Sequence, residues 1–169
     1  MLTLNLGHLA REGSSVVQGS LSGNDDFWKD SGFSWVGALV ADLRAMYAGS
    51  GEVVVRGPAR GVLRQDCRRC LDSVETPFAR DLTMVFVAGP SGDEDDGGVY
   101  PLEPEGEELD LSQAVREEVI LAVNPYVECD PKCRGLCPRC GTNLNREVCA
   151  CTDDEVDPRW AALRDLKSE

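Results

Sequence analysis

The chain has 169 residues, 42% of them apolar, and a formal net charge of −13. This length accommodates one hydrophobic core, or one core with a small satellite unit. Because the negative charge repels phosphate backbones over long range, it argues against a surface that binds nucleic acid throughout, and local binding would need a sheltered basic patch.

The N-terminal segment and the longest uncharged runs give no export or membrane signal. The first 13 residues lack the cationic leader and apolar core of a signal peptide. The uncharged runs at 13–24 and 31–41 are too short to span a bilayer. We therefore expect a cytoplasmic protein without a membrane partner. Disulfides are disfavoured in a reducing cytosol, so eight cysteines there point to metal binding.

The first half of the chain reads as strands in an antiparallel meander. Apolar residues alternate in 1–6, which predicts a half-buried strand, and 16–21 is a candidate partner strand. The pattern in 33–47 also fits a helix, but its alternation and the Gly-Ser-Gly turn that follows favour a strand, with 52–55 as the return strand.

The meander continues to residue 88. A Gly-Pro turn at 57–58 leads into a strand at 59–66, and 75–87 supplies another long strand. The sequence Cys67-Arg68-Arg69-Cys70 lies at the turn between these two strands. We therefore predict a β-meander over roughly residues 38–88 with a cysteine knuckle at one end.

The second half of the chain is divided by acidic segments. We expect an acidic loop over 89–108 and a helix over 111–123, with Asp110 as its N-cap and an apolar face that packs on the sheet. The predicted organisation is a β-rich core domain at 1–125, a zinc-knuckle module at 126–151, and an acidic link with a C-terminal helix at 152–169.

Six of the eight cysteines lie between residues 129 and 151. In Cys137-Pro138-Arg139-Cys140-Gly141, the proline sets the turn between two thiols and the glycine permits a positive φ after the second. Residues two apart on a strand face the same side, so the thiols of the Cys149-Ala150-Cys151 segment can bind the same ion. Cys137, Cys140, Cys149 and Cys151 therefore form a predicted tetrahedral zinc site.

The remaining cysteines form a candidate second site: Cys67, Cys70, Cys129 and Cys133. Cys129 and Cys133 fall on one side of a single helical turn. This site would join the meander to the knuckle module. One alternative is a single metal, with these four thiols reduced and merely close. An iron–sulfur cluster also takes four thiolates, although the knuckle with a Cys-x-Cys return suits one tetrahedral ion better.

The sequence offers little for catalysis. His8 is the single histidine and lies far in sequence from every cysteine, and no nucleophile elbow is present. A thiol redox role for the Cys67–Cys70 pair is a weaker alternative, because the α/β pattern of thioredoxin-like proteins is missing. Cations near the cysteines are candidate partner-binding residues, unless they offset thiolates and neighbouring acids: Arg64, Arg68, Arg69, Lys132, Arg134 and Arg139.

Four motifs together resemble the YceD family of large ribosomal RNA subunit accumulation proteins. They are CRRCL, LDLSQAVREEVILAVNP, CDPKCRGLCPRCGTNLN and DPRWAALRDL, and the resemblance covers roughly residues 50–169. It implies a small, non-enzymatic bacterial protein that supports production or stability of the large-subunit rRNA.

We therefore expect an α+β protein: an antiparallel β-meander with one packed helix, a four-cysteine zinc-knuckle module and a short C-terminal helix. Its expected role is that of a non-enzymatic accessory factor with one or two Zn²⁺ ions, which binds large-subunit rRNA, a ribosomal protein or an assembly factor. No small-molecule substrate is expected. One alternative is a zinc-stabilised adaptor unrelated to ribosomes. A second, less favoured alternative is a thiol oxidoreductase.

Overall fold

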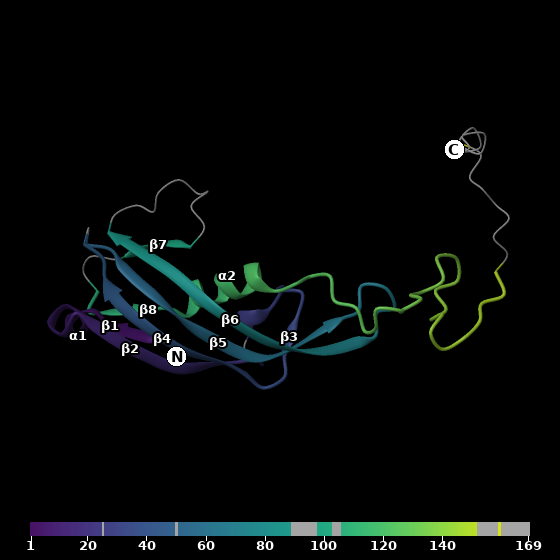
Figure 1. Ribbon diagram of the computed structural model, residues 1–169, viewed down its shortest axis with the longest axis horizontal. Coiled ribbons are helices and arrows are strands. Elements are labelled where there is room, and N and C mark those ends of the chain that lie inside the picture. Colours follow the sequence, from purple (N-terminus) through teal and green to yellow (C-terminus); the bar gives the residue numbers. More distant parts are fainter. Residues whose placement is uncertain (25, 50, 89–97, 103–105, 152–158, 160–169) are drawn as a thin grey trace.

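The computed structural model describes residues 1–24, 26–49, 51–88, 98–102, 106–151 and 159. Figure 1 shows a long twisted sheet with helical segments against it, while the chain between the last labelled helix and residue 151 runs beyond the end of the sheet. Among the described residues, no helix is long and apolar enough to cross a bilayer.

The main sheet contains the predicted meander. Its strand order is β2-β4-β5-β6-β7, and the short strand β3 also pairs with β5. The bounds are Ser14–Ser22 for β2, Ser34–Trp35 for β3, Ala38–Tyr47 for β4, Val53–Asp66 for β5, Ser73–Ala88 for β6 and Val99–Leu102 for β7. Strands β2, β4, β5 and β6 are antiparallel, whereas β7 lies parallel to β6. The strand interpretation of 33–47 is thus confirmed, and the sheet is mixed at one edge.

The predicted turn at 57–58 is wrong, because β5 continues through it. The register between β5 and β6 is unbroken from Val53 opposite Phe86 to Asp66 opposite Ser73. A Cβ on Gly57 would collide with the carbonyl oxygen of Asp42 on β4, so glycine permits a close approach of two backbones. Gly57 and Pro58 therefore interrupt the β4 pairing locally without ending the strand.

The N-terminal strand pairs differently from the prediction. Strand β1 (Thr3–Asn5) lies antiparallel to β8 (Glu108–Asp110), and not beside β2. The helix α1 (Leu6–Glu12), which the alternation concealed, separates β1 from β2. The side chain of Asn5 accepts a hydrogen bond from the His8 amide, and Gly13 ends the helix at φ 74°. Asn5 and Gly13 are the sequence signal for α1, and the prediction missed it because the alternation of 1–6 favoured a strand.

The acidic segment 89–108 is not wholly a loop, since it contains β7 and the start of β8. Val99 and Tyr100 pair with Val85 and Phe86 of β6, so apolar residues after the acidic run extend the sheet. The rest of the expected loop at 89–97 and 103–105 lies outside the described residues. The same holds for the acidic link and the C-terminal helix expected within 152–169, apart from Arg159.

Helix α2 (Ser112–Ala122) packs on the sheet as predicted. Ala114, Val115 and Val119 are buried, and Leu111 just before the helix is fully buried. The Asp110 side chain accepts a hydrogen bond from the amide of Ser112, although Leu111 occupies the formal N-cap position. The helix therefore covers one face of the sheet over β6.

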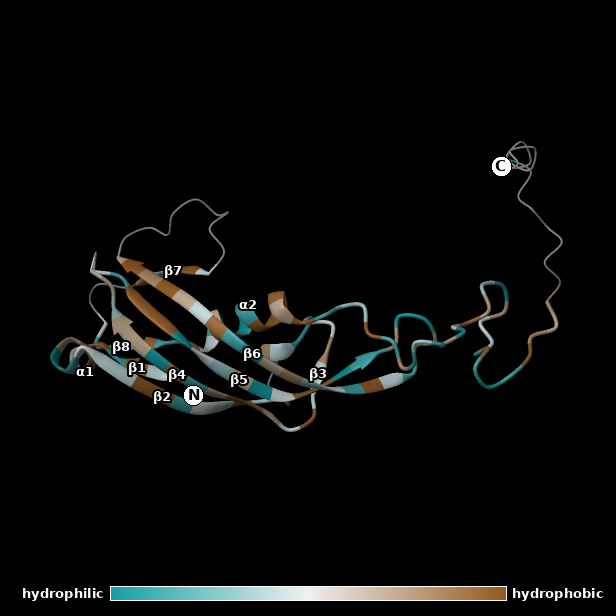
Figure 2. Cartoon of the chain, viewed as in Figure 1, coloured by the Kyte–Doolittle hydropathy of each residue, from teal (hydrophilic) through white to brown (hydrophobic). Residues whose placement is uncertain are grey.

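The larger of two core clusters among the described residues lies between the sheet and the elements that cover this face. Buried residues alternate with exposed ones along β4 and β6, which Figure 2 shows as alternating colours along β6. An aromatic group extends the core near the cysteine end of the sheet, where the Trp35 ring makes edge contacts with Trp28, Phe33 and Phe78. These contacts involve Phe78 of β6 and Trp35 of β3, which pairs with β5.

Candidate metal centres

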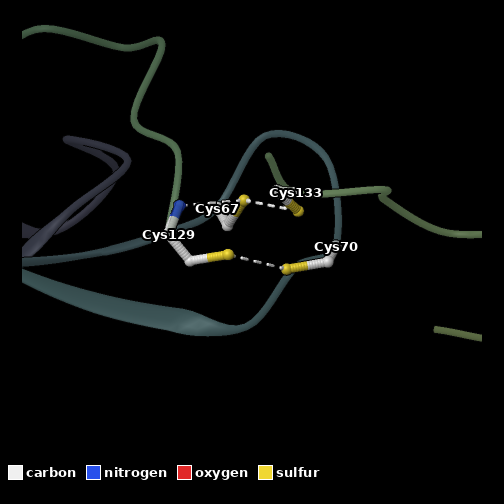
Figure 3. A group of neighbouring side chains, drawn as sticks. All are labelled: Cys67, Cys70, Cys129 and Cys133. Atoms are coloured by element: carbon white, nitrogen blue, oxygen red, sulfur yellow. Dashed lines mark hydrogen bonds between the residues drawn. The ribbon is translucent and has the colours of Figure 1, made fainter. Parts of the chain in front are cut away.

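Four thiols meet at the turn between β5 and β6, two from the turn itself and two from a later segment. We call this group the sheet-end cluster: Cys67, Cys70, Cys129 and Cys133. The four sulfur atoms lie within 4.8 Å of one another, with 3.5 Å between Cys70 and Cys129 and 3.9 Å between Cys67 and Cys133 (Figure 3). Cys129 is exposed and the other three are buried. The cluster thus joins the sheet to a segment about 60 residues further along the chain.

The remaining thiols form a second group, the module cluster: Cys137, Cys140, Cys149 and Cys151. Their sulfur atoms also lie within 4.8 Å of one another. Cys137 is buried, Cys149 is partly exposed, and Cys140 and Cys151 are exposed. The structure therefore sorts the eight cysteines into the two sets that the spacing predicts, and the module cluster is the more accessible one.

Both Cys-x-x-Cys turns have the same backbone geometry. In the first, the Leu71 amide donates to the Cys67 carbonyl and the Cys67 amide to the Asp72 carbonyl. In the second, the corresponding bonds run from Gly141 to Cys137 and from Cys137 to Thr142. The residue after the second cysteine has a positive φ in each turn, 59° at Leu71 and 74° at Gly141. The sequence prediction recognised the second turn from its glycine, but Leu71 gave no such signal.

Hydrogen-bond donors surround the sulfur atoms and shift their protonation. Burial alone would raise the pKa of Cys67, but backbone amides of Cys129, Cys70 and Arg69 point at its sulfur and lower the pKa to about 6. Hydrogen bonds from Thr142, through its hydroxyl and its amide, lower the pKa of Cys140 to about 6 as well. The Asn145 side-chain amide lies 3.3 Å from the Cys133 sulfur.

Each cluster also contains a thiol whose pKa is raised. The backbone amide of Asp72 favours a thiolate at Cys70, but burial and the neighbouring sulfurs raise its pKa above the ordinary value. At Cys151, contact with the Cys140 sulfur and burial raise the pKa to about 12. Each cluster thus combines a thiol that ionises readily with at least one that a divalent cation would have to deprotonate.

The two donor sets fit a tetrahedral ion. A zinc ion with four sulfur ligands at about 2.3 Å has sulfur–sulfur separations of about 3.8 Å. The 3.5 and 3.9 Å separations in the sheet-end cluster bracket this value. The amides that point at the sulfurs match the electrostatic needs of bound thiolates. These clusters could therefore each bind a metal ion.

Direct contacts also tie the module to the β5–β6 turn. The Arg68 amide donates to the Val127 carbonyl, and the Leu136 amide donates to the Arg69 carbonyl. Asp72, just after the turn, accepts hydrogen bonds from the Asn143 amide group and the Arg146 guanidinium. Sequence reasoning missed this anchoring role of Asp72, which no motif marks. The segment 127–146 is consequently docked on the end of the sheet by its backbone as well as by its thiols.

The six predicted partner-binding cations divide into two groups. Arg64 forms an ion pair with Glu75 across β5 and β6, and Arg68 forms one with Glu128. In the part of the chain that the structure describes, no ion pair involves the other four: Arg69, Lys132, Arg134 and Arg139. Neutralisation of neighbouring acids thus accounts for Arg64 and Arg68, and leaves four exposed cations around the clusters.

A comparison with known families identifies the chain. A model of the YceD family, described as large ribosomal RNA subunit accumulation protein YceD, matches residues 55–167. This match spans more than half of the chain and includes all eight cysteines. The chain belongs to the YceD family. The description of this family names accumulation of the large ribosomal RNA subunit.

Individual relatives agree with this assignment. A chloroplast protein of Arabidopsis thaliana, named large ribosomal RNA subunit accumulation protein YCED homolog 1, is 36% identical over 66 residues, which are 39% of this chain and 21% of that protein. An uncharacterized protein of Mycobacterium tuberculosis is 33% identical over 136 residues, or 77% of this chain and 63% of that protein. The YceD chain thus covers less than two thirds of either relative. No solved structure matches it.

Proposed function

We propose that this YceD protein is a non-enzymatic cytoplasmic factor that supports accumulation of large-subunit rRNA by binding, with one zinc ion in each four-cysteine cluster. The observation that carries the proposal is the pair of four-thiol clusters in a chain of this family. A zinc ion bound to four thiolates has a structural role, because its coordination is closed. In the sheet-end cluster it would hold the module against the β5–β6 turn.

The described residues support binding over catalysis. His8 lies exposed on α1, whereas the clusters lie beyond the other end of the sheet. Two closed tetrathiolate centres leave no ligand position for a substrate. The chain's own residues then serve to fix a surface: Asp72 and Arg69 hold the module in place, and cations next to the ligands face solvent.

The partner on this proposal is a component of the assembling large subunit, either its rRNA or a ribosomal protein. The four cations without an ion pair among the described residues provide a local basic surface on an acidic protein. Such a surface suits phosphate contacts at one place, while the remaining acidic surface suits a basic protein.

The proposal predicts that loss of a centre reduces large-subunit rRNA in cells. In a bacterium that lacks its own copy of the gene, the wild-type chain should restore the ratio of large- to small-subunit rRNA. Cys70→Ser and Cys140→Ser should restore it poorly at matched protein levels, while the surface control Tyr47→Ala should behave as wild type. An unchanged ratio in the strain without the chain, or full restoration by both cysteine variants, would refute the proposal.

A further inference from the structure

An exposed tyrosine lies between α2 and the sheet-end cluster. Tyr126 is 67% exposed, although it is three residues from Cys129. The guanidinium carbon of Arg68 lies 5.6 Å from the centroid of its ring. Arg68 thus covers one part of the aromatic ring, and most of the side chain remains open to solvent.

This pair is held in place from both sides. The side-chain oxygen of Asn124 accepts a hydrogen bond from the Tyr126 amide at 2.9 Å. The Arg68 amide donates to Val127, and the Arg68 side chain is paired with Glu128. Arg68 and Glu128 are also each adjacent in sequence to a cysteine of the sheet-end cluster. A metal ion in that cluster would therefore preorganise the tyrosine and arginine together.

Two exposed cations belong to the turn and to the segment that supply the ligands of the sheet-end cluster. Arg69 follows Arg68 in the turn, and Lys132 precedes Cys133 of the same cluster. Both are exposed, and neither takes part in an ion pair among the described residues. The two nearby acids have other partners: the Asp130 carboxylate accepts a hydrogen bond from the backbone amide of Lys132, and Glu128 forms an ion pair with Arg68. Phosphate contacts at this place would thus come from Arg69 and Lys132.

We propose that Tyr126 and Arg68 form a stacking platform for one unpaired nucleobase of single-stranded RNA, with Arg69 and Lys132 on the neighbouring phosphates. The inference rests on the proposed function and selects RNA over a ribosomal protein as the ligand of this site. An aromatic ring backed by a guanidinium and flanked by cations is the arrangement that binds unstacked bases. It also satisfies the requirement that an acidic chain bind RNA only through a local basic site.

The test uses fluorescence anisotropy with a labelled single-stranded RNA dodecamer and the zinc-loaded full chain. Tyr126→Ala should weaken binding by about 5- to 150-fold, the range that follows loss of one base–aromatic stack. Tyr126→Phe, which keeps the ring, should bind within twofold of wild type, and Tyr126→Leu, which keeps bulk alone, should resemble Tyr126→Ala. The matched control is Tyr47→Ala. Tyr47 is also exposed, but it lies beside Val53, about 40 Å along β5 from the cluster.

Two further results separate stacking from general charge attraction. Arg69→Gln and Lys132→Gln should each reduce the salt dependence of binding by about one phosphate contact. The same RNA annealed into a duplex should bind more weakly than the single strand, because its bases are already stacked. Zinc content should be equal in all variants.

The proposal is overturned if the wild-type chain does not bind the single strand, or if Tyr126→Ala binds as wild type. It is also overturned if Tyr126→Ala loses a ribosomal protein from pull-downs while its RNA affinity is unchanged. In these cases rRNA accumulation that still depends on the cysteine clusters would leave the proposed function standing.

Discussion

Leu71 stands where the equivalent turn has glycine. It has φ 59°, in the left-handed region that costs a non-glycine residue about 1–2 kcal/mol. Its side chain is 62% exposed, so burial offsets little of this cost. The bonds from Leu71 to Cys67 and from Cys67 to Asp72 hold the strained residue in place. The turn thus keeps its shape because the thiols and the backbone determine it together.

We expect Leu71→Gly to stabilise the zinc-loaded protein by up to about 1 kcal/mol, since glycine adopts a positive φ without strain but has more freedom in the unfolded chain. Leu71→Ala keeps the strain and should give no gain. In the other turn, Gly141→Ala should destabilise by about 1 kcal/mol, because Gly141 has φ 74°. Urea midpoints measured with excess zinc test all three variants. A Leu71→Gly midpoint as low as that of Gly141→Ala would contradict the shared geometry.

At this scale, sequence predicted the cysteines better than their surroundings. The module cluster was predicted from spacing, because a Cys-x-x-Cys turn and a Cys-x-Cys segment restrict the reach of their thiols, and the sheet-end cluster was the candidate set left by the remaining cysteines. The hydrogen bonds of Asp72 to Asn143 and Arg146 join residues more than 70 positions apart. No local pattern encodes such contacts, which depend on how the turn and the module meet.

Among the elements, the sequence predicted the strands with regular alternation. It did not predict the continuation of β5 or the partner of β1. The predictions for β4, β6 and α2 followed from one-sided burial, which the structure confirms. The continuation of β5 through Gly57 and Pro58 depends on a close approach to Asp42 of another strand. The pairing of β1 with β8 likewise joins segments about 105 residues apart, and alternation does not specify a partner.

The β5–β6 turn and the module should respond differently to loss of their own centres. Structural zinc contributes on the order of 10 kcal/mol to folding of such segments. Cys140→Ser should therefore raise amide exchange mainly in 137–151, while β4–β6 keep their protection. Cys70→Ser should raise exchange in the 67–72 turn and in 126–136, where the bonds to Val127 and Leu136 are made.

Amide hydrogen exchange followed by mass spectrometry measures both effects. Val148→Ser is a matched control, because Val148 lies in the module and is 92% exposed. Equal loss of protection throughout the chain in Cys140→Ser would show that the module belongs to the same cooperative core as the sheet. The predicted boundary near residue 126 would then be wrong.

In the molecule as a whole, the two clusters follow one another from the β5–β6 turn at the end of the sheet to residue 151. The sheet-end cluster takes two ligands from the β5–β6 turn and two from the start of the module, and the module cluster follows within the next residues. The apolar core lies on the other side of the turn, among the strands and α2. Metal binding is thus expected to order the surface that carries Tyr126 and the exposed cations, with little effect on the sheet.

The central claim is that these are two separate zinc centres, and native mass spectrometry of the purified protein tests it most directly. Wild type should carry two zinc ions. The double variant Cys67→Ser with Cys70→Ser should carry one, and so should Cys137→Ser with Cys140→Ser, because each loses half of the ligands of one cluster. Wild-type protein that carries no metal, or iron with inorganic sulfide, would contradict the claim. So would a pair of double variants that both lose all zinc.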